Sequence, residues 1–404
     1  MLNFEEIALS YNITPESEIS DRISRFQKIL QREEIQAAVI VQLIDRFYFS
    51  GTIQDGVLLI PAEGDPRYLC RRSVERAKSE SPLQVVPFKS FKEVPLSLED
   101  LGALHAARLG LELDVIPAAL YQRFSSLVEG ADWVDLGPLV REVRAIKSPY
   151  EIERIRAAGV QVGKVVDTAR EALVEGLREV EFASILEKRA RELGHQGILR
   201  MRGFNQELFY GHIFSGPDAA VISHLDAPLG GKGMNPSLAQ GAGLRTIRCE
   251  EPVVVDFVGN VGGYLIDQTR IMVIGDLDGE VEEGCGQART IADAVVSAAS
   301  PGVLWSGMWD VATVTARDLG VTDRFMGPEG QQVRFVGHGI GLEVDEYPFL
   351  APRLDLELKA GMVFALEPKI FHPGVGISGI EDTYLVTDDG LERLTVTERE
   401  IIRV

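Results

Sequence analysis

The sequence predicts an α+β protein of two domains. Its 404 residues exceed the size of one typical domain. In the first third of the chain, short β-prone runs follow a helical pattern, as in an α/β unit. A helix-start signal then precedes a larger region of mixed helices and strands that contains an internal repeat. We therefore expect one domain over residues 1–145 and a second over residues 146–404.

The first domain is expected to open with an amphipathic helix. Ser20 is a suitable N-cap, and apolar residues recur at helical spacing over residues 23–30. Short β-prone runs follow at residues 37–41, 57–60 and 85–88. This alternation predicts an α/β domain.

The second domain is expected to begin with a long helix that starts after Ser148. Serine is a favoured N-cap, Pro149 occupies the first helical position, and Glu151 stands where a capping box requires an acid. Apolar residues at helical spacing continue over residues 152–166. The domain boundary is therefore placed near residue 146.

This second domain contains a weak internal repeat at a spacing of 126 residues. Residues 190–194 (ARELG) fall on residues 316–320 (ARDLG), and residues 211–212 fall on residues 337–338. Both halves have the pattern of helix, loop, helix and strand. The repeat predicts two related halves packed face to face, and the cleft between such halves is a natural place for a site.

Two acidic residues interrupt a predicted hairpin. Asp256 lies in the β-prone run 251–259, and Asp267 lies in the β-prone run 263–275. Glycines between the two runs predict a turn. If the hairpin is symmetric about its midpoint, the two acids are cross-strand neighbours with Cβ atoms about 5 Å apart, where like charges are destabilising.

A second predicted hairpin repeats the pattern. Glu367 interrupts residues 362–371, Glu381 interrupts residues 376–387, and symmetry about Gly374 pairs the two acids. Each pair repels by about 3 kcal/mol at an effective dielectric constant of about 20. A fold retains four such acids by protonating some of them or by binding a cation. The alternative is that each acid points to solvent, as isolated strand carboxylates usually do.

A glycine-flanked histidine completes the candidate site. His338 lies within residues 335–341, where neighbouring glycines remove side-chain bulk. One imidazole and four carboxylates suit a pair of divalent ions such as manganese, cobalt, iron or zinc. The alternative is a packed or surface histidine that binds nothing.

The composition argues against several classes of partner. Lys and Arg number 41 against 61 Asp and Glu, and the net charge of −20 repels nucleic acid and anionic membranes. The sequence contains no apolar run of membrane-helix length, and residues 1–10 lack the pattern of a secretion signal, so we expect a cytoplasmic protein. Cys70, Cys249 and Cys285 share no metal-type spacing and are expected to be small buried residues.

These motifs resemble those of the pita-bread metallopeptidases, the family that includes aminopeptidase P, prolidase, methionine aminopeptidase and creatinase. The similar metal motifs are residues 256–270, 337–344, 366–368 and 380–382. Residues 22–51 and 146–158 resemble the N-terminal domain and the linker helix of the aminopeptidase P and prolidase branch. The resemblance implies a creatinase-type, ribonuclease H-like α/β domain followed by a pita-bread domain with a pseudo-twofold internal repeat.

The resemblance also implies roles for the five candidate ligands. Asp267 and Glu381 would bridge two metal ions, and Asp256 would complete the first of them. His338 and Glu367 would complete the second ion. Glu367 would also accept a proton from water and return it to the leaving amine. The implied activity is hydrolysis of short peptides at Xaa-Pro bonds, of the dipeptidase or aminopeptidase P type, by a homodimer.

Several departures from the family pattern concern the substrate side of the site. Asp345 stands where the prolidase branch has a second histidine. Gly379 stands where the family often has an arginine, so a cationic group near the site is expected to be missing. A substrate-side catalytic histidine follows a Ser-Gly-Pro segment in the family. His224 matches that position, and His212 competes with it for the role.

Two other functions stay open at this point. The same fold and metal site would suit a small non-peptide substrate, with the chain acting as an amide hydrolase or a lyase. Asp345 and Gly379 motivate this alternative, because both alter the charge where a substrate carboxylate would dock. The other alternative is an inactive, peptidase-like binding protein, although every expected metal ligand is present. In the enzyme hypotheses, Asp345 and Tyr264 are expected to contact the substrate.

Overall fold

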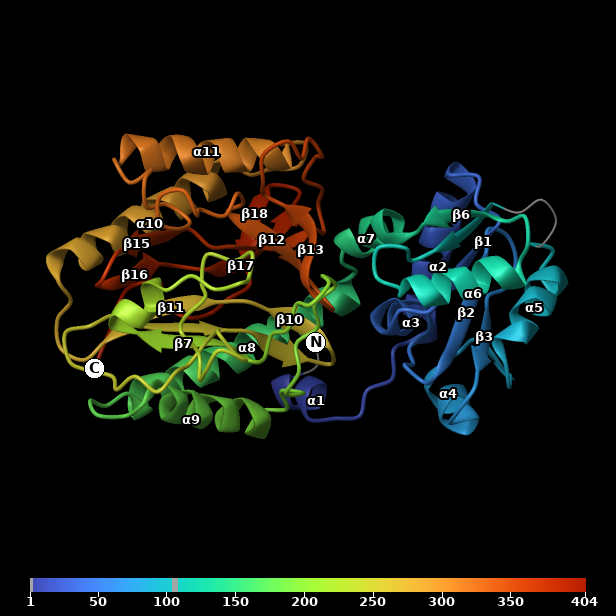
Figure 1. The fold of residues 1–404 in the computed structure, drawn as a ribbon, viewed down its shortest axis with the longest axis horizontal. Coiled ribbons are helices and arrows are strands. Elements are labelled where there is room, and N and C mark those ends of the chain that lie inside the picture. Colours follow the sequence, from blue (N-terminus) through green and yellow to red (C-terminus); the bar gives the residue numbers. More distant parts are fainter. Residues whose placement is uncertain (1–2, 104–107) are drawn as a thin grey trace. The chain divides into compact units, whose positions relative to one another are not determined.

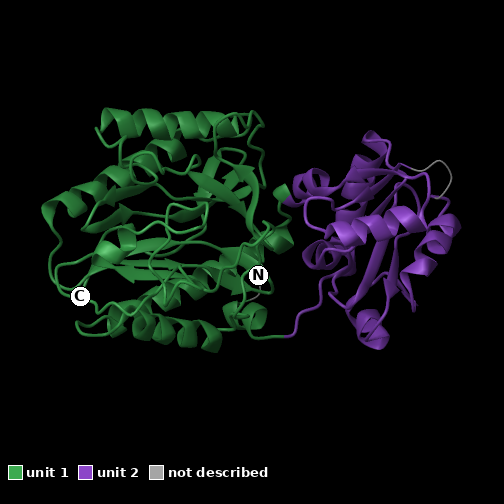
Figure 2. Ribbon diagram, viewed as in Figure 1, with its two compact units in different colours: residues 1–10, 145–404 green, residues 11–144 purple. Residues whose placement is uncertain are grey.

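The computed structural model describes residues 3–103 and 108–404, and the chain forms two compact units (Figure 2). Residues 11–144 form the smaller unit. Residues 3–10 belong with residues 145–404 in the larger unit. The expected first domain, residues 1–145, therefore differs from the smaller unit at its start.

Contacts of the first helix explain this difference. Helix α1 (Phe4–Ala8) packs on helix α8 (Pro149–Ala172) of the larger unit. Ile7 is buried, and Lys164 Nζ lies 4.2 Å from the centroid of the Phe4 ring. The local sequence of α1 gave no sign of this tertiary contact.

A six-stranded mixed sheet forms the core of the smaller unit, in the order β4-β3-β2-β1-β5-β6. Strand β2 is antiparallel to β1 and β3, and the other neighbours are parallel. The strands are β1 (Ala37–Ile40), β2 (Gly56–Pro61), β3 (Arg67–Cys70), β4 (Gln84–Pro87), β5 (Arg108–Leu111) and β6 (Asp132–Asp135). The helices are α2 (Glu16–Arg32), α3 (Leu43–Ser50), α4 (Val74–Glu80), η1 (Phe91–Glu93), α5 (Val94–Asp100), α6 (Ala118–Leu127) and α7 (Gly137–Ala145). The expected α/β alternation is confirmed.

Helix α2 begins one turn earlier than expected. Pro15 is its N-cap residue, and Glu16 and Glu18 in the first turn stabilise the helix N-terminus electrostatically. Ile19 is fully buried, so the apolar face extends ahead of Ser20. The expected cap, Ser20, is therefore an exposed residue inside the helix.

The larger unit places two pairs of helices on opposite sides of its strands (Figure 1). Its helices after α1 are α8 (Pro149–Ala172), α9 (Glu179–Glu192), η2 (Gly216–Ala220), α10 (Gly279–Ala298) and α11 (Trp305–Asp318). The strands of the first half, with the C-terminal strand, are β7 (Gly211–Ser215), β8 (Val253–Phe257), β9 (Gly259–Val261), β10 (Tyr264–Ile266), β11 (Thr269–Val273) and β19 (Ile402–Arg403). The strands of the second half are β12 (Gly337–Ile340), β13 (Val344–Phe349), β14 (Val363–Leu366), β15 (Lys369–His372), β16 (Gly376–Gly379), β17 (Asp382–Thr387) and β18 (Gly390–Arg393).

The internal repeat is confirmed by the element positions. Helices α9 and α11 begin at Glu179 and Trp305, which are 126 residues apart, and strands β7 and β12 begin at Gly211 and Gly337, at the same spacing. The expected start of α8 is also confirmed, because Ser148 and Glu151 form a complete capping box. The two halves contribute a four-stranded sheet, β19-β11-β8-β7, and a five-stranded sheet, β13-β12-β14-β17-β18.

The first hairpin has a different register from the one expected. Asp256 pairs with Thr269 rather than with Asp267. The turn is centred on Gly262 and Gly263, which have φ values of 61° and 88°, as a two-residue hairpin turn requires. Because side chains alternate between faces along a strand, this shift of two residues leaves Asp267 on the same side as Asp256.

The second hairpin has the register that symmetry about Gly374 predicts. Leu366 pairs with Asp382, and Lys369 pairs with Gly379. Glu367 and Glu381 therefore lie opposite each other, at the point where strands β14 and β17 end and the ribbon of β15 and β16 begins. Residues from both sides of the unit meet at this point.

Two further expectations can be compared with the structure. No helix among the described residues has the length and apolar character needed to cross a membrane. Cys70 and Cys285 are buried as expected, whereas Cys249 is exposed. Cys249 lies in the loop before β8, and its backbone N–H donates a hydrogen bond to Glu175, so the expectation of burial was wrong for this residue.

Candidate metal centre

The centre lies where the two hairpins leave their sheets and continue as ribbons. Asp256 is in β8, and Asp267 lies between β10 and β11. Glu367 and Glu381 flank the ribbon of β15 and β16. The two hairpins are joined directly, because Thr383 Oγ1 donates to the backbone oxygen of Asp267 at 2.8 Å. This contact holds the backbone of Asp267 against the second hairpin.

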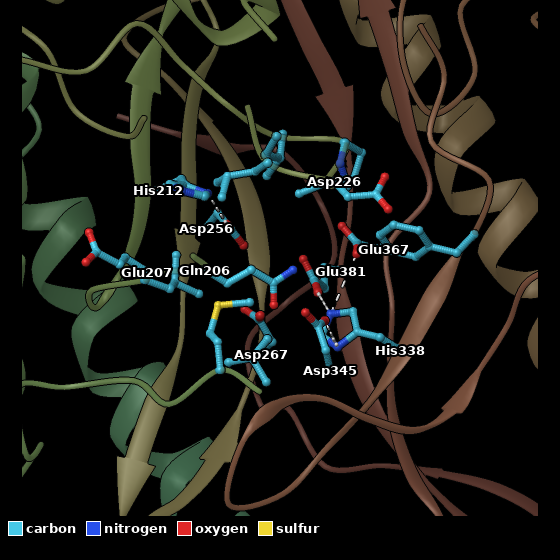
Figure 3. A pocket seen from close by; sticks show the side chains of 18 residues that line it. Gln206, Glu207, His212, Asp226, Asp256, Asp267, His338, Asp345, Glu367 and Glu381 are labelled. Carbon is cyan, nitrogen blue, oxygen red and sulfur yellow. Dashed lines mark ion pairs between the residues drawn. The ribbon is translucent and has the colours of Figure 1, made fainter. Parts of the chain in front are cut away.

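The structure brings all five expected ligands together. Ligand atoms of Asp267, His338 and Glu381 lie within 4.8 Å of one another, and all three residues are buried. His338 Nε2 lies 3.6 Å from Glu367 Oε1 and 3.8 Å from Glu381 Oε1. Thr269 Oγ1 lies 2.8 Å from Asp256 Oδ1 and 2.7 Å from Glu381 Oε2, which places Asp256 beside the same group. Figure 3 shows these side chains converging from separate strands.

The electrostatics of the cluster match the expected conflict between like charges. Burial and the neighbouring charge of Glu381 raise the pKa of Asp267 well above its usual value. Burial and Glu381 also raise the pKa of Glu367 to about 8. The pKa of Asp256 is lowered, because the hydrogen bond from His212 and the charge of Lys369 outweigh the effect of burial. Four buried carboxylates and one imidazole fit divalent cations by their chemistry and their proximity.

Lys369 is a member of this cluster that the sequence analysis missed. Its Nζ lies 3.3 Å from Glu367 Oε2 and 3.1 Å from Glu381 Oε2, and its side chain is fully buried. The expectation that the site lacks a cationic group, drawn from Gly379, was therefore wrong. Lys369 lies opposite Gly379 in the ribbon, and a Cβ atom at position 379 would overlap the Lys369 stem.

The two candidate histidines lie in different surroundings. His212 is buried, lines the pocket above the carboxylates, and pairs with Asp256 across strands β7 and β8. Its Nδ1 lies 3.5 Å from Asp256 Oδ2 (Figure 3). His224 is exposed, and its Nδ1 is hydrogen-bonded to the hydroxyl of Ser223. The geometry therefore brings His212, and not His224, to the cluster.

The two residues expected to contact the substrate, Asp345 and Tyr264, also lie in different surroundings. Asp345 lines the pocket, and its Oδ1 lies 3.5 Å from His338 Nδ1. The charge of Asp345, followed by that of Glu367, raises the pKa of His338 against the opposing effect of burial. Tyr264 is almost fully buried, and its ring packs edge-to-face on Tyr150 with centroids 6.4 Å apart. Tyr264 is not among the described residues that line the pocket.

The pocket over the cluster has an acidic wall. Besides the expected ligands, Glu207, Asp226 and Asp345 line it. No lysine or arginine is among its lining residues in the described part of the chain. The negative charge of this wall opposes the binding of a substrate carboxylate close to the cluster.

Comparison with known proteins identifies the family. Residues 153–388, which contain the whole cluster, match Metallopeptidase family M24. The chain belongs to this family. Residues 22–146 match the Creatinase/Prolidase N-terminal domain. Membership of the M24 family makes the chain a metallohydrolase and implies divalent metal ions.

Similar proteins cover nearly the whole chain. The Xaa-Pro dipeptidase of Pyrococcus furiosus is 28% identical over 386 residues, which are 95% of this chain and 100% of that protein. The prolidase of Pyrococcus horikoshii OT3 has a similar structure, with a TM-score of 0.79 and 26% identity over 95% of this chain and 100% of that one. The X-Pro aminopeptidase of Thermotoga maritima MSB8 gives a TM-score of 0.78 and 25% identity over 95% of this chain and 99% of that one. The expected two-domain α+β fold, with its creatinase-type and pita-bread parts, is confirmed.

Proposed function

We propose that this chain hydrolyses Xaa-Pro bonds in short peptides and that it uses two divalent ions. The observation that carries the proposal is the convergence of four buried carboxylates and His338 beneath a pocket. Relatives of matching length are named Xaa-Pro dipeptidases, which supports the choice of bond. Manganese, cobalt, zinc and iron all suit this donor set, and we propose manganese as the first ion to test.

Five residues of the chain would hold the ions. They are Asp256, Asp267, His338, Glu367 and Glu381. When bound, two such ions polarise a substrate carbonyl and lower the pKa of water. We infer that the site suits these ions from the chemistry of its ligand atoms. Its hard carboxylate oxygen atoms and single imidazole nitrogen match the preferences of these ions.

The protein's own groups would move protons and exclude water. Glu367 faces the pocket, where its carboxylate can exchange a proton with water and with the leaving group. It would accept a proton from water and deliver it to the proline nitrogen that leaves. His212, beside Asp256, would hydrogen-bond the substrate from the opposite wall. The Gly339 backbone oxygen, 3.2 Å from His338 Nδ1, and Asp345, 3.5 Å from the same atom, would orient the His338 ring.

A kinetic experiment tests the proposal. Protein loaded with Mn²⁺ should release the first amino acid from Xaa-Pro dipeptides or from longer Xaa-Pro peptides, and Glu367→Ala should abolish this release. Glu207→Gln is a matched control, because Glu207 lines the same pocket but is exposed and contacts none of the five ligands in the described structure. If the Mn²⁺-loaded protein is inert towards a broad peptide panel, the proposed substrate class is wrong.

The acidic pocket wall favours a second candidate, a small substrate without a carboxylate beside the scissile bond. Glu207, Asp226 and Asp345 would accept a cationic group in such a substrate. Amide hydrolysis or elimination on a non-peptide amine would use the same cluster. A screen of small amines and amides with the Mn²⁺-loaded protein distinguishes this candidate from peptide hydrolysis.

We also propose that the protein is a cytoplasmic homodimer. Cys70, Cys249 and Cys285 are unpaired in the described structure, as is common for proteins of a reducing compartment. The proposal of a dimer rests on the family resemblance. Light scattering on the purified chain tests it, and a monomer mass at micromolar concentration would contradict it.

A further inference from the structure

We propose that Lys369 is an internal counter-ion that competes with divalent metal ions for Glu367 and Glu381. In the metal-free protein it holds the two carboxylates together, and for the same reason it weakens the binding of metal. The inference rests on the proposed function only in taking these two residues as metal ligands.

Lys369 contacts one oxygen atom of each carboxylate. Its Nζ lies 3.3 Å from Glu367 Oε2 and 3.1 Å from Glu381 Oε2, whereas the Oε1 atoms of both residues face His338 Nε2. Thr269 Oγ1 also contacts Glu381 Oε2, at 2.7 Å. A metal ion that needs this oxygen of Glu381 must therefore share it with a hydroxyl and an ammonium group. Cations that share one ligand atom repel each other, most strongly in a buried site.

The surrounding ribbon keeps the ammonium group in place. Lys369 pairs with Gly379, and the absence of a side chain at position 379 leaves room for the lysine stem. The backbone oxygen of Lys369 accepts a hydrogen bond from the backbone N–H of Met326, at 2.9 Å. The Lys369 side chain has no exposed surface. The ammonium group therefore cannot move into water without opening the ribbon, so a metal ion meets it as a fixed charge.

The positive charge of Lys369 affects both the stability of the metal-free protein and its affinity for metal ions. With all four carboxylates ionised, Lys369 neutralises one of four negative charges. Removing the ammonium group would leave Glu367 and Glu381 buried without their cation, which destabilises the metal-free fold. It would also increase the attraction of the cluster for a divalent ion. The two effects have opposite consequences for the metal-free and metal-bound proteins, and they can be measured together.

Lys369→Met tests the proposal, because methionine replaces the ammonium group with an apolar side chain of similar length. The full chain is stripped with a chelator, dialysed and titrated with Mn²⁺ by calorimetry, and its thermal unfolding is followed with and without Mn²⁺. We expect Mn²⁺ affinity to rise at least tenfold. We also expect the Tm of the metal-free variant to fall and the increase in Tm caused by Mn²⁺ to exceed that of the wild type.

Lys147→Met is the matched control. Lys147 is also buried and bonds a carboxylate, with its Nζ 2.6 Å from Glu346 Oε2, but Glu346 is not one of the expected ligands. This variant should lose stability equally with and without metal and keep the wild-type affinity for Mn²⁺. An equal gain in affinity in both variants would overturn the proposal, because the effect would then not depend on contact with the ligands.

Unchanged or weaker Mn²⁺ binding by Lys369→Met would also overturn it. If Lys369→Met unfolds when the metal is removed, its less stable metal-free fold by itself raises the free Mn²⁺ needed to keep the structure. The rate at which the folded, Mn²⁺-loaded protein releases Mn²⁺ to excess chelator is then measured instead. Slower release than from Lys147→Met would support the proposal, and equal or faster release would overturn it. None of these readouts depends on peptide hydrolysis. A protein that shows the affinity change but cleaves no peptide would refute the proposed function alone.

Discussion

Replacing Asp267 with asparagine is expected to stabilise the metal-free protein and to remove most of the stabilisation that metal provides. Asp267 and Glu381 have carboxylate oxygens within 4.8 Å of each other, and both residues are buried. Two full charges at that separation repel by about 3 kcal/mol at an effective dielectric constant of about 20. Burial and Glu381 raise the pKa of Asp267, so protonation already relieves part of this repulsion in the wild type. The expected gain at pH 8 is therefore smaller, at about 1–2 kcal/mol.

Chemical denaturation measures this gain. Unfolding of chelator-treated protein in urea at pH 8 is compared for the wild type, Asp267→Asn and Glu207→Gln. Asparagine keeps the side-chain oxygen that accepts the hydrogen bond from the Gln268 backbone N–H, at 2.8 Å in the wild type. Mn²⁺ should then stabilise the wild type and the Glu207 control but have little effect on Asp267→Asn. The reasoning is refuted if the metal-free variant is less stable than the wild type, or if Mn²⁺ stabilises it as much.

Three further predictions concern acid stability, the histidines and the substrate. Burial lowers the pKa of His195 to about 4, so the unfolded chain binds more protons between pH 4 and the usual value of about 6.5. Acidification across this window should therefore cost about 3 kcal/mol of stability. The free energy of unfolding, measured in urea, should depend less on pH in His195→Gln than in the wild type. The same pH dependence in both proteins would contradict the lowered pKa of His195. His212→Ala should lower kcat for Xaa-Pro hydrolysis by about 100-fold or more, whereas His224→Ala should leave it unchanged. Equal kcat values in the two variants would refute the choice of His212. Finally, an Xaa-Pro peptide with a carboxyl-terminal amide should have a higher kcat/KM than the same peptide with a free carboxyl terminus, because the pocket wall is acidic. Added salt screens this repulsion and should reduce the difference in kcat/KM. A preference for the free acid would refute this interpretation.

The positions of the helices in the larger unit could be read from the sequence because local signals and the repeat agreed. Ser148 and Glu151 form the capping box that their spacing predicts. The spacing of 126 residues places the starts of both α9 and α11. Where only one signal was present, the prediction was less accurate. Ser20 has the chemistry of a cap, but burial of Ile19 extends α2 past it.

The predicted register of the first hairpin was wrong because its glycine-rich turn region allows more than one position for the centre of the turn. Residues 259–263 contain three glycines, and symmetry about the middle of the two β-prone runs selected the wrong centre. A two-residue turn with positive φ at both positions needs adjacent permissive residues, and Gly262 and Gly263 provide them. This rule would have placed Thr269 opposite Asp256. The second hairpin has a clearer turn at Gly374, and its predicted register was correct.

The role of Lys369 was missed although the predicted register already contained the signal. Symmetry about Gly374 pairs Lys369 with Gly379, and a lysine in an apolar strand opposite a glycine needs a buried anionic partner. Gly379 was instead interpreted alone, as a lost cation. The contacts of His212 and Tyr264 could not be inferred in this way. They depend on how separate strands and helices of the larger unit pack together, which residue spacing does not encode.

The cluster reduces its internal repulsion in three ways that all oppose metal binding. Asp267 and Glu367 have raised pKa values, so they tend to hold protons. Lys369 supplies a fixed positive charge, and Thr269 is hydrogen-bonded to the carboxylates. An arriving divalent ion must displace the protons and tolerate the ammonium group, so metal binding should become more favourable as pH rises. The same contacts explain how the ligands stay close together before the ion arrives. The fold therefore preassembles the proposed metal centre, and we infer that it does so at the expense of metal affinity.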